Sequence, residues 1–441
     1  MTCLELIRNK AFWLIDALRG GQIKSSLNEM KRINGGLVDE AVVASYQNAS
    51  LSQLLQHAIQ TVPRYRNMTS LSLQDWPISN KDSFRCDYEM SLSNSFKKEH
   101  LIKMTTSGST GTPFTSYQDI RKKRHVNAEV LFYNGQTGFL IGRRIIYLRS
   151  VVAEVSKSRI TQFAQNIYLL DCMDLSDRGI ENLLASIREY TRYEGAMMMG
   201  YSSTLDAFRK YFEKHGLERA KECKIYGIVA GSEMLLDVTR KSVEQAFGCK
   251  CYSRYANEEN GFLGQDGIEN NVFLMNDAHY ITEILKFDKD EPAEFGEVGR
   301  IVITDLFNYA MPMIRYDTGD VGAWTYVETD GRQRKAIGSF GGRIIDMVTD
   351  VNGNMISPHT ITNMMWKYQN VLQFQLIQKD VNRYEIKLNV NDSFDEEKSL
   401  IDDYSKIFGE ESIISIEYTQ EIPVLASGKR RYVVNETLIR K

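Results

Sequence analysis

The sequence lacks several patterns that would assign a function at once. Its 441 residues include six cysteines but no CxxC pair, and Cys249 and Cys251 are too close together for the usual zinc spacing. No apolar run approaches the roughly 20 residues of a transmembrane helix. The formal net charge is −3, whereas general nucleic-acid binders carry a strong basic excess. These absences predict free, mostly buried thiols, no transmembrane segment and no nucleic-acid partner.

The first residues also lack the apolar centre and small-residue cleavage site of a signal peptide, so we expect a soluble cytoplasmic protein. One short apolar patch, AFWLIDAL, covers residues 11–18. Core packing is the first interpretation of this patch. Peripheral contact with a membrane surface is the second.

The remaining composition is that of a globular protein of two or three domains, with 43% hydrophobic and 25% charged residues. Residues 1–100 have mainly helical patterns, including Val38–Ile59. Helices and strands alternate over residues 120–260, which predicts a sheet flanked by helices. The pattern is rich in strands after residue 270 and mixed from residue 343, which indicates a small α+β domain.

A loop rich in glycine, serine and threonine is the most specific motif. Thr105–Phe114 reads TTSGSTGTPF, with four hydroxyl side chains and two glycines in Thr106–Gly111. Glycines let the backbone approach a polyanion, and turn N–H groups and hydroxyls bind phosphate oxygens. The GK[ST] ending of a Walker A loop is absent. Taken alone, the loop fits a phosphate site and a flexible turn equally well.

Two further segments follow predicted strands. VAGSE at Val229–Glu233 follows an apolar strand and is expected to open a helix, a common ligand position in α/β sheets. In YSRYANEENG, Glu258 and Glu259 follow Tyr255 closely. An aromatic ring can stack on a base, and a carboxylate can hold Mg²⁺ beside phosphates. A plain connection and a charged surface turn are the alternatives.

Two motifs in the C-terminal part of the sequence contribute a carboxylate and a lysine. RYDTGD places Asp320 after a glycine at an expected strand start, where a carboxylate can accept hydrogen bonds from ribose hydroxyls. PVLASGKRR places Lys429 in a tight loop, where it can neutralise charge on an α-phosphate. A common turn and an exposed basic tail are the alternatives. The order of all these motifs along one chain is more informative than any one of them.

That order, with the GGRIID segment between the last two motifs, resembles the adenylate-forming superfamily of acyl-CoA synthetases, amino-acid adenylation domains and luciferases. Within it the chain is most similar to the phenylacetate–CoA ligase branch and its capsule-biosynthesis subgroup, CapK. The resemblance includes VPRYRN at Val62–Asn67 and WPISNKD at Trp76–Asp82. It implies an α/β fold, with a large adenylation domain of mixed sheets flanked by helices over residues 1–342 and a small, mobile C-terminal α+β domain over residues 343–441.

The resemblance also implies a role for each matching residue. The ATP phosphates would be held by Thr106, Ser107, Gly108, Ser109, Thr110 and Gly111. The adenine would lie against Gly231, Ser232 and Glu233, with Tyr255, Ala256, Asn257 and Glu258 beside it. Glu259 would be the Mg²⁺ ligand, Asp320 would hold the ribose with Arg343, and Lys429 would be the adenylation lysine. Glu259 and Lys429 are thus the expected catalytic residues. An acyl pocket is expected between Tyr133–Gly138, Met197–Tyr201 and Ala230–Glu233.

Three positions depart from the superfamily pattern. Phe114 replaces a lysine of the phosphate loop, as is frequent in this branch. Ala256 replaces a glycine, so the ligand is expected to approach the backbone less closely there. Ile345 replaces a polar residue of the hinge between the domains.

The implied function is an ATP- and Mg²⁺-dependent ligase that converts a carboxylic acid into an acyl-adenylate. The acyl group would pass to coenzyme A or to an amine, such as that of an amino sugar, in surface polysaccharide biosynthesis. One alternative is a non-catalytic or regulatory nucleotide-binding protein of the same fold, which Ala256 and Ile345 favour. The other is an adenylyltransferase that moves AMP onto a phosphate-bearing cofactor.

Overall fold

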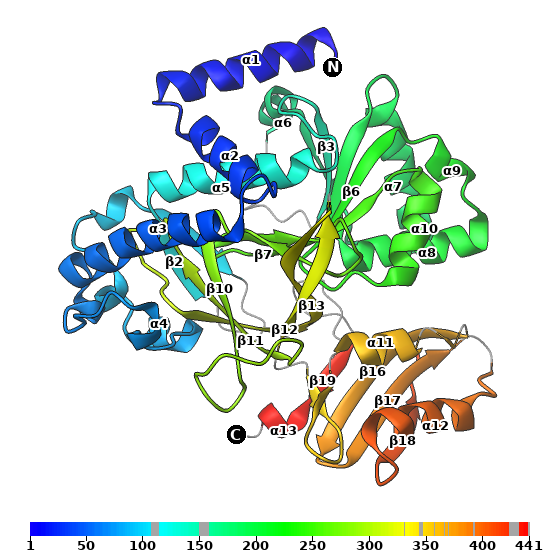
Figure 1. Cartoon of the computed structure of the whole chain (residues 1–441). Coiled ribbons are helices and arrows are strands. Elements are labelled where there is room, and N and C mark those ends of the chain that lie inside the picture. Colours follow the sequence, from blue (N-terminus) through cyan, green and yellow to red (C-terminus); the bar gives the residue numbers. More distant parts are fainter. Residues whose placement is uncertain are drawn as a thin grey trace.

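The structure is a computed structural model that describes residues 1–106, 114–149, 158–329, 331–343, 347–356, 358–365, 367–368, 370–390, 393–422 and 432–439. Two large sheets and their helices form one body, and a smaller sheet with three helices forms a second, coloured orange to red in Figure 1. The predicted α/β fold with several mixed sheets and a C-terminal domain is confirmed.

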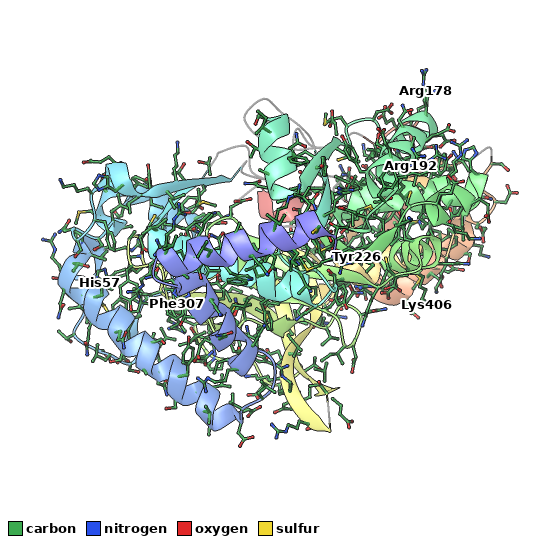
Figure 2. All side chains as sticks on the ribbon, turned by 90° about the horizontal axis from the view of Figure 1, so that it is seen from above. His57, Arg178, Arg192, Tyr226, Phe307 and Lys406 are labelled. Atoms are coloured by element: carbon green, nitrogen blue, oxygen red, sulfur yellow. The ribbon has the colours of Figure 1, made fainter. Side chains whose placement is uncertain are left out.

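The N-terminal segment is mainly helical, as predicted. Its α-helices are α1 (Cys3–Leu18), α2 (Gln22–Ile33), α3 (Glu40–Thr61) and α4 (Lys81–Cys86). Short 3₁₀ turns follow α3 and α4 at Pro63–Tyr65, Leu73–Asp75, Glu89–Ser91 and Lys98–His100. Asn80 caps α4 by accepting a hydrogen bond from Ser83 N, a favoured way to satisfy a free backbone donor. Figure 2 shows the same body from above, with α1 lying across its outer surface.

A seven-stranded sheet is the centre of the large body. Its strands are β3 (Arg144–Arg149), β4 (Ile167–Asp171), β5 (Ala196–Tyr201), β6 (Ile225–Gly231), β7 (Cys251–Asn257), β8 (Gly261–Gln265) and β9 (Leu274–Met275). The order is β4-β3-β5-β6-β7-β8-β9, parallel from β4 to β7 and antiparallel beyond. Parallel strands need crossover helices, which explains the alternating sequence pattern.

Helices cover both faces of this sheet. They are α5 (Ile120–Gly135), α6 (Arg159–Gln165), α7 (Asp177–Thr191), α8 (Ser202–His215), α9 (Glu218–Lys221) and α10 (Asp237–Phe247). On one face, Leu184 of α7, Phe208 of α8 and Val243 of α10 pack on the strands. On the other, Leu131 of α5 contacts a separate cluster with Met197 and Val229. The carboxyl ends of β5, β6 and β7 therefore stay at one open edge between the two layers.

A four-stranded antiparallel sheet lies beside the first. Its strands, in order, are β10 (Tyr280–Leu285), β11 (Gly299–Asp305), β12 (Tyr316–Thr329) and β13 (Arg332–Arg343). A hairpin of β1 (Ile102–Thr106) and β2 (Phe114–Gln118) precedes α5. The phosphate-loop motif therefore joins two paired strands, as its flanking sequence predicts.

The C-terminal body has its own hydrophobic core. Its elements are β14 (Val348–Thr349), β15 (Met355–Ile356), α11 (Pro358–Met365), β16 (Val371–Asp380), β17 (Arg383–Val390), α12 (Glu397–Phe408), β18 (Ile413–Tyr418), β19 (Val433–Asn435) and α13 (Glu436–Ile439). Four of them form a sheet in the order β18-β17-β16-β19. Phe374, Ile386 and Phe408 belong to a cluster built from residues 348–433 alone, which accounts for a body that is small yet compact.

Three sequence expectations need correction. The helix after VAGSE begins at Asp237 and not at the corner itself, because Ser232 has φ +68° and continues the turn. Asp320 lies inside β12, since Tyr316 already pairs with Ile303 of β11. In the apolar patch, Leu14 and Leu18 are 62% and 79% exposed, so core packing is wrong for them. Only one face of this 16-residue helix packs on the rest of the protein, so apolar residues around the remainder of its circumference stay exposed.

The structure can be compared with two predictions from composition, which concern transmembrane helices and the state of the cysteines. No helix among the described residues is both long and apolar enough to cross a membrane. All six cysteines are free thiols, and Cys3 and Cys86 are the exposed pair. Burial raises the pKa of the Cys223 thiol to about 12, which keeps it protonated and unreactive near neutrality.

Candidate functional site

A buried carboxylate lies at the turn between β7 and β8. Glu259 is 1% exposed, whereas its neighbour Glu258 is exposed. The Glu259 Oε1 atom lies 2.6 Å from the Lys81 ammonium and accepts a hydrogen bond of 3.1 Å from the Tyr316 hydroxyl. Of the two adjacent acids of the motif, Glu259 is therefore the one whose side chain is held in place, by Lys81 of α4 and Tyr316 of β12.

The phosphate-loop hairpin ends next to this carboxylate. Gln118 Nε2 at the end of β2 donates to the Glu259 backbone oxygen at 3.2 Å. The Phe114 ring at the start of β2 is 1% exposed and lies 6.0 Å from the Lys81 ammonium. Lys81 thus contacts both the predicted metal ligand and the residue that follows the loop. Residues 107–113 of the loop lie outside the described residues, and Thr106 is described only as the last residue of β1.

Asp320, the predicted ribose ligand, is hydrogen-bonded to Tyr255, which is predicted to lie beside the adenine. The Tyr255 hydroxyl donates to Asp320 Oδ2 at 2.9 Å and lies 3.1 Å from Thr318 Oγ1. Its ring is 5% exposed and packs on Phe340 at 4.7 Å between centroids. Stacking of Tyr255 on an adenine stays a prediction, whereas its contact with Asp320 gives it a positioning role toward that carboxylate.

The register between β12 and β13 brings Arg343, another predicted site residue, next to Asp320. Asp320 of β12 is the direct partner of Arg343 at the end of β13. Opposed residues on antiparallel strands have Cβ atoms only about 5 Å apart. The paired ends of β12 and β13 therefore bring together two residues that are 23 positions apart in the sequence.

The VAGSE corner lies on the neighbouring strand end. Val229 and Ala230 of β6 pair with Tyr252 and Ser253 of β7, so Gly231 and Tyr255 emerge at the same edge of the parallel strands. Glu233 Oε2 accepts a hydrogen bond of 2.8 Å from Ser203 N, where a carboxylate complements the start of α8.

The segments of the expected acyl pocket are also neighbours in space. Tyr201 at the end of β5 pairs with Gly231. A Cβ atom on Gly227 would lie 2.6 Å from Thr137, so the end of α5 packs directly against β6. The ends of β5 and β6 are therefore adjacent, whereas Thr137 contacts the middle of β6, and the pocket itself stays a prediction.

Burial controls the protonation of the two tyrosines. Burial raises the pKa of Tyr255 well above its usual 10, and the nearby Asp320 charge raises it further. Burial and the Glu259 charge do the same for the pKa of Tyr316. Both hydroxyls therefore stay neutral donors near pH 7 and orient the two carboxylates.

The Glu259 carboxylate fits the metal that the sequence predicts. Mg²⁺ prefers hard oxygen donors, and it is usually bound by one or two carboxylates together with substrate phosphates. Glu259 provides one such oxygen, and Lys81, which contacts it, lies 6.0 Å from the Phe114 ring at the loop side of the hairpin. Its present partner, Lys81, supplies a positive charge at the same carboxylate.

Sequence reasoning missed Lys81. It belongs to the WPISNKD segment that carried the family resemblance, yet no role was assigned to it. The signal was weak, because a lysine on a capped surface helix is ordinary. Lys429 and Ile345, and the Arg343 side chain, lie outside the described residues.

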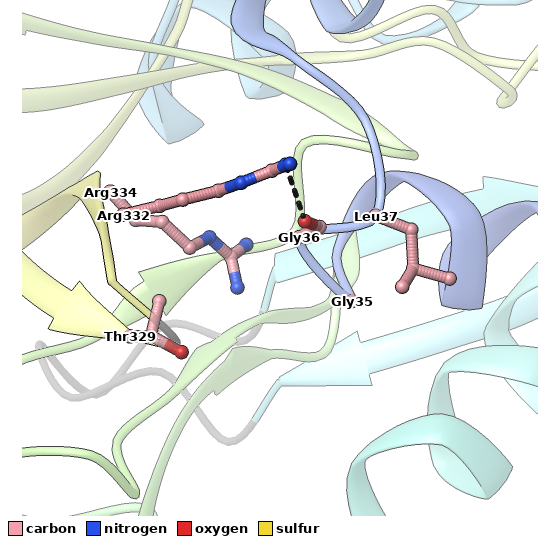
Figure 3. Close-up of a pocket in the computed structure, with 6 residues that line it drawn as sticks. All are labelled: Gly35, Gly36, Leu37, Thr329, Arg332 and Arg334. Carbon is pink, nitrogen blue, oxygen red and sulfur yellow. Dashed lines mark hydrogen bonds between the residues drawn. The ribbon is translucent and has the colours of Figure 1, made fainter.

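Two cavities of about 290 Å³ lie away from these residues. One is lined by Gly35, Gly36 and Leu37 on one side and by Arg332 and Arg334 of β13 on the other (Figure 3).

The other cavity borders a buried polar network between α2 and α5. Ser26 Oγ lies 3.0 Å from His279 Nε2, and His279 Nδ1 lies 2.7 Å from Glu129 Oε1. Lys122 Nζ forms an ion pair with Asp305 at 2.8 Å deeper in the same region. All of these groups are buried with partners, and they tie α2 to the large body.

Comparison with known proteins was made on the whole chain. Residues 348–436 match the family described as the CapK C-terminal domain. Protein CapK of Staphylococcus aureus is 22% identical over 386 residues, which cover 84% of this chain and 82% of that protein. Phenylacetate-coenzyme A ligase of Thermus thermophilus is 28% identical over 205 residues, or 44% of each chain. The crystal structure of 2-hydroxyisobutyryl-CoA ligase in the postadenylation state superposes with a TM-score of 0.67 at 15% identity, covering 89% of this chain and 90% of that one.

Proposed function

We propose that this chain is an ATP-dependent ligase of the adenylate-forming superfamily, because it is similar in sequence to CapK and phenylacetate–CoA ligase and in fold to an acyl-CoA ligase. It activates a carboxylic acid as an acyl-adenylate, releases pyrophosphate and passes the acyl group to an acceptor. One observation supports this most. Glu259 is linked through Tyr316 to β12, the strand that carries Asp320, and through Gln118 to β2 of the phosphate-loop hairpin, although these segments are far apart in the sequence.

Each residue has a task in this proposal, and the described contacts of Asp320 and Glu259 support theirs. Asp320, oriented by Tyr255, accepts hydrogen bonds from the ribose hydroxyls. Glu259 holds Mg²⁺, which when bound offsets charge on the phosphates. The loop Thr106–Gly111 holds the phosphates, and the Gly231–Glu233 corner lies against the adenine. Lys429 offsets charge at the α-phosphate, where the carboxylate attacks.

We divide the chain at residues 342 and 343 into an adenylation domain and a mobile C-terminal domain. The separate core of residues 348–433 supports this division. In this proposal the C-terminal domain, whose sequence includes Lys429, approaches the ATP site for adenylation and withdraws for acyl transfer.

For the acceptor we propose coenzyme A or an amine, such as that of an amino sugar in surface polysaccharide synthesis. The amine is suggested only by the capsule-biosynthesis subgroup that the sequence resembles. The resemblance to phenylacetate-coenzyme A ligase supports the thiol. A competition between the two acceptors separates them.

The first experiment measures ATP-dependent pyrophosphate release with a panel of aromatic and small carboxylic acids. We expect release with at least one acid, its loss in Lys429→Ala and its strong reduction in Glu259→Gln. The matched control is Lys398→Ala, which removes an exposed lysine of α12 in the same C-terminal body and should retain full activity.

The outcomes distinguish the candidate functions. ATP binding without pyrophosphate release from any acid would favour the non-catalytic nucleotide-binding protein. Release with a stable adenylated product and no acyl transfer would indicate an adenylyltransferase. When an active acid is found, mass spectrometry of a reaction that contains both coenzyme A and an amino sugar identifies the acceptor by the thioester or the amide formed.

A further inference from the structure

Helix α1 has the reverse of the polarity expected of a helix on a soluble protein. Such a helix normally buries its apolar face and exposes its polar one. In α1 the buried side chains are Glu5 and Asp16, at 3% and 4% exposure. The exposed apolar side chains are Leu4 at 41%, Leu6 at 44%, Ile7 at 60%, Leu14 at 62%, Ile15 at 48% and Leu18 at 79%.

The outward residues form one continuous stripe. Leu4, Ile7, Ala11, Leu14 and Leu18 are separated by three or four positions, the spacing that aligns side chains along one face of a helix. All five are exposed. Figure 1 places α1 at the upper edge of the large body, and in Figure 2 no other element lies over it. The stripe therefore faces outward along the length of the helix.

Polar contacts hold the opposite face of α1 to the body. Asp16 caps the following helix, because its carboxylate oxygens accept hydrogen bonds from Ile23 N at 3.1 Å and Lys24 N at 3.0 Å. Asn9 Nδ2 donates to the Ile141 oxygen at 2.9 Å. Gly142, at φ +95°, lies so close that a Cβ atom there would be 2.3 Å from the Glu5 oxygen. The helix is thus anchored in an orientation that keeps its apolar stripe outward.

The charges around the stripe have one sign. Residues 1–28 contain two acidic residues, Glu5 and Asp16, and both are buried. Lys10, Arg19 and Lys24 are exposed in the same segment. An apolar stripe on a segment whose exposed charges are basic is complementary to a lipid surface with anionic headgroups.

We propose that α1 docks this protein onto an anionic membrane surface, lying in the plane of the interface with its Leu4–Leu18 stripe among the acyl chains. A helix of 16 residues is about 24 Å long and too short to span the hydrocarbon core. A second copy of the chain fits the face less well. A two-fold contact through the stripe would bring the same basic residues of both copies together. This inference does not depend on the catalytic activity.

Vesicle flotation with the full chain tests the proposal. The probes are vesicles of phosphatidylcholine alone and vesicles of equal parts phosphatidylcholine and phosphatidylglycerol. We expect the protein to float with the anionic vesicles, to bind the neutral ones much more weakly, and to be released by high salt.

Two variants examine the apolar and the charged components separately. Ile7→Ser with Leu18→Ser should weaken binding by at least about tenfold, because two aliphatic side chains no longer leave water. Lys10→Glu with Lys24→Glu should also weaken it by at least about tenfold, through the charge alone.

The matched control is Val381→Ser with Ile413→Ser, which replaces aliphatic residues of the C-terminal body that are 60% and 56% exposed. This control should bind like the unaltered protein. Absence of vesicle binding, or equal loss in the control, would overturn the proposal. So would a dimer in analytical ultracentrifugation that dissociates in Ile7→Ser with Leu18→Ser while neither protein binds vesicles. Pyrophosphate release needs no lipid in this proposal, so failure of either proposal leaves the other intact.

Discussion

Replacing Lys81 with methionine removes the ammonium group that lies 2.6 Å from the Glu259 carboxylate. Glu259 has only 2% of its side chain exposed, so it would keep a buried charge with the Tyr316 hydroxyl as a described partner. Removing one member of a fully buried pair costs about 3 to 5 kcal/mol. The Lys81 side chain is 32% exposed, so water can reach the vacated position, and we expect a cost of about 2 kcal/mol.

A double-mutant cycle gives this number a sharper test. Glu259→Gln alone should cost about 1 kcal/mol or less, because Lys81 can turn toward water. The double variant should be close to Glu259→Gln alone, which makes the coupling energy about 2 kcal/mol. The matched control is Lys98→Met. Lys98 pairs with Glu89 at the same 2.6 Å, but their side chains are 47% and 71% exposed, so its loss should cost about 0.5 kcal/mol or less.

Scanning calorimetry measures the effect without relying on activity. Lys81→Met should lower the melting temperature of the large body by several degrees, as expected for about 2 kcal/mol in a large domain. Mg²⁺ should raise this temperature more in Lys81→Met than in the unaltered protein, since no ammonium competes for the carboxylate. It should have less effect in Glu259→Gln. A coupling energy near zero, or an equal Mg²⁺ response in all variants, would refute the reasoning.

Three further predictions concern other parts of the chain. Tyr255→Phe should weaken ATP binding several-fold in calorimetric titration by releasing Asp320, with little change in circular dichroism. Burial raises the pKa of Asp277 from 3.8 to about 6, so the folded state loses stability as pH rises through this window. Asp277→Asn should therefore stabilise the protein by about 3 kcal/mol at pH 7 and by nothing at pH 3, measured by urea unfolding. In a thiol-labelling assay, Cys3 and Cys86 should react rapidly, and the buried Cys172, Cys223 and Cys251 only after denaturation.

Much of the fold could be predicted because local patterns agree with it. The apolar strand expected before VAGSE is β6, and the helices and strands expected to alternate over residues 120–260 are α5 to α10 with β3 to β7. Side chains at these positions alternate or repeat with the period of the element they form, so the sequence contains the information directly. The hairpin around the phosphate loop was predictable for the same reason.

The site was predictable only as a set of motifs. Nothing local in the sequence brings Tyr255 to Asp320, because the contact depends on β7 of one sheet and β12 of another lying side by side. The choice of Glu259 over Glu258 follows from which side chain the β7–β8 turn directs inward. Lys81 became part of the site only when α4 packed next to that turn.

By itself, the sequence determined the succession of helices and strands, the two-body architecture and the order of the motifs, because these depend on residue periodicity and on chemistry at fixed spacing. The tertiary structure alone decided which residues share a site and which face of each helix meets water. Helix α1 shows the difference most clearly. Its apolar residues predicted a core, but packing turned Glu5 and Asp16 inward and left Leu14 and Leu18 outside, since hydrogen bonds to the neighbouring backbone fix that orientation.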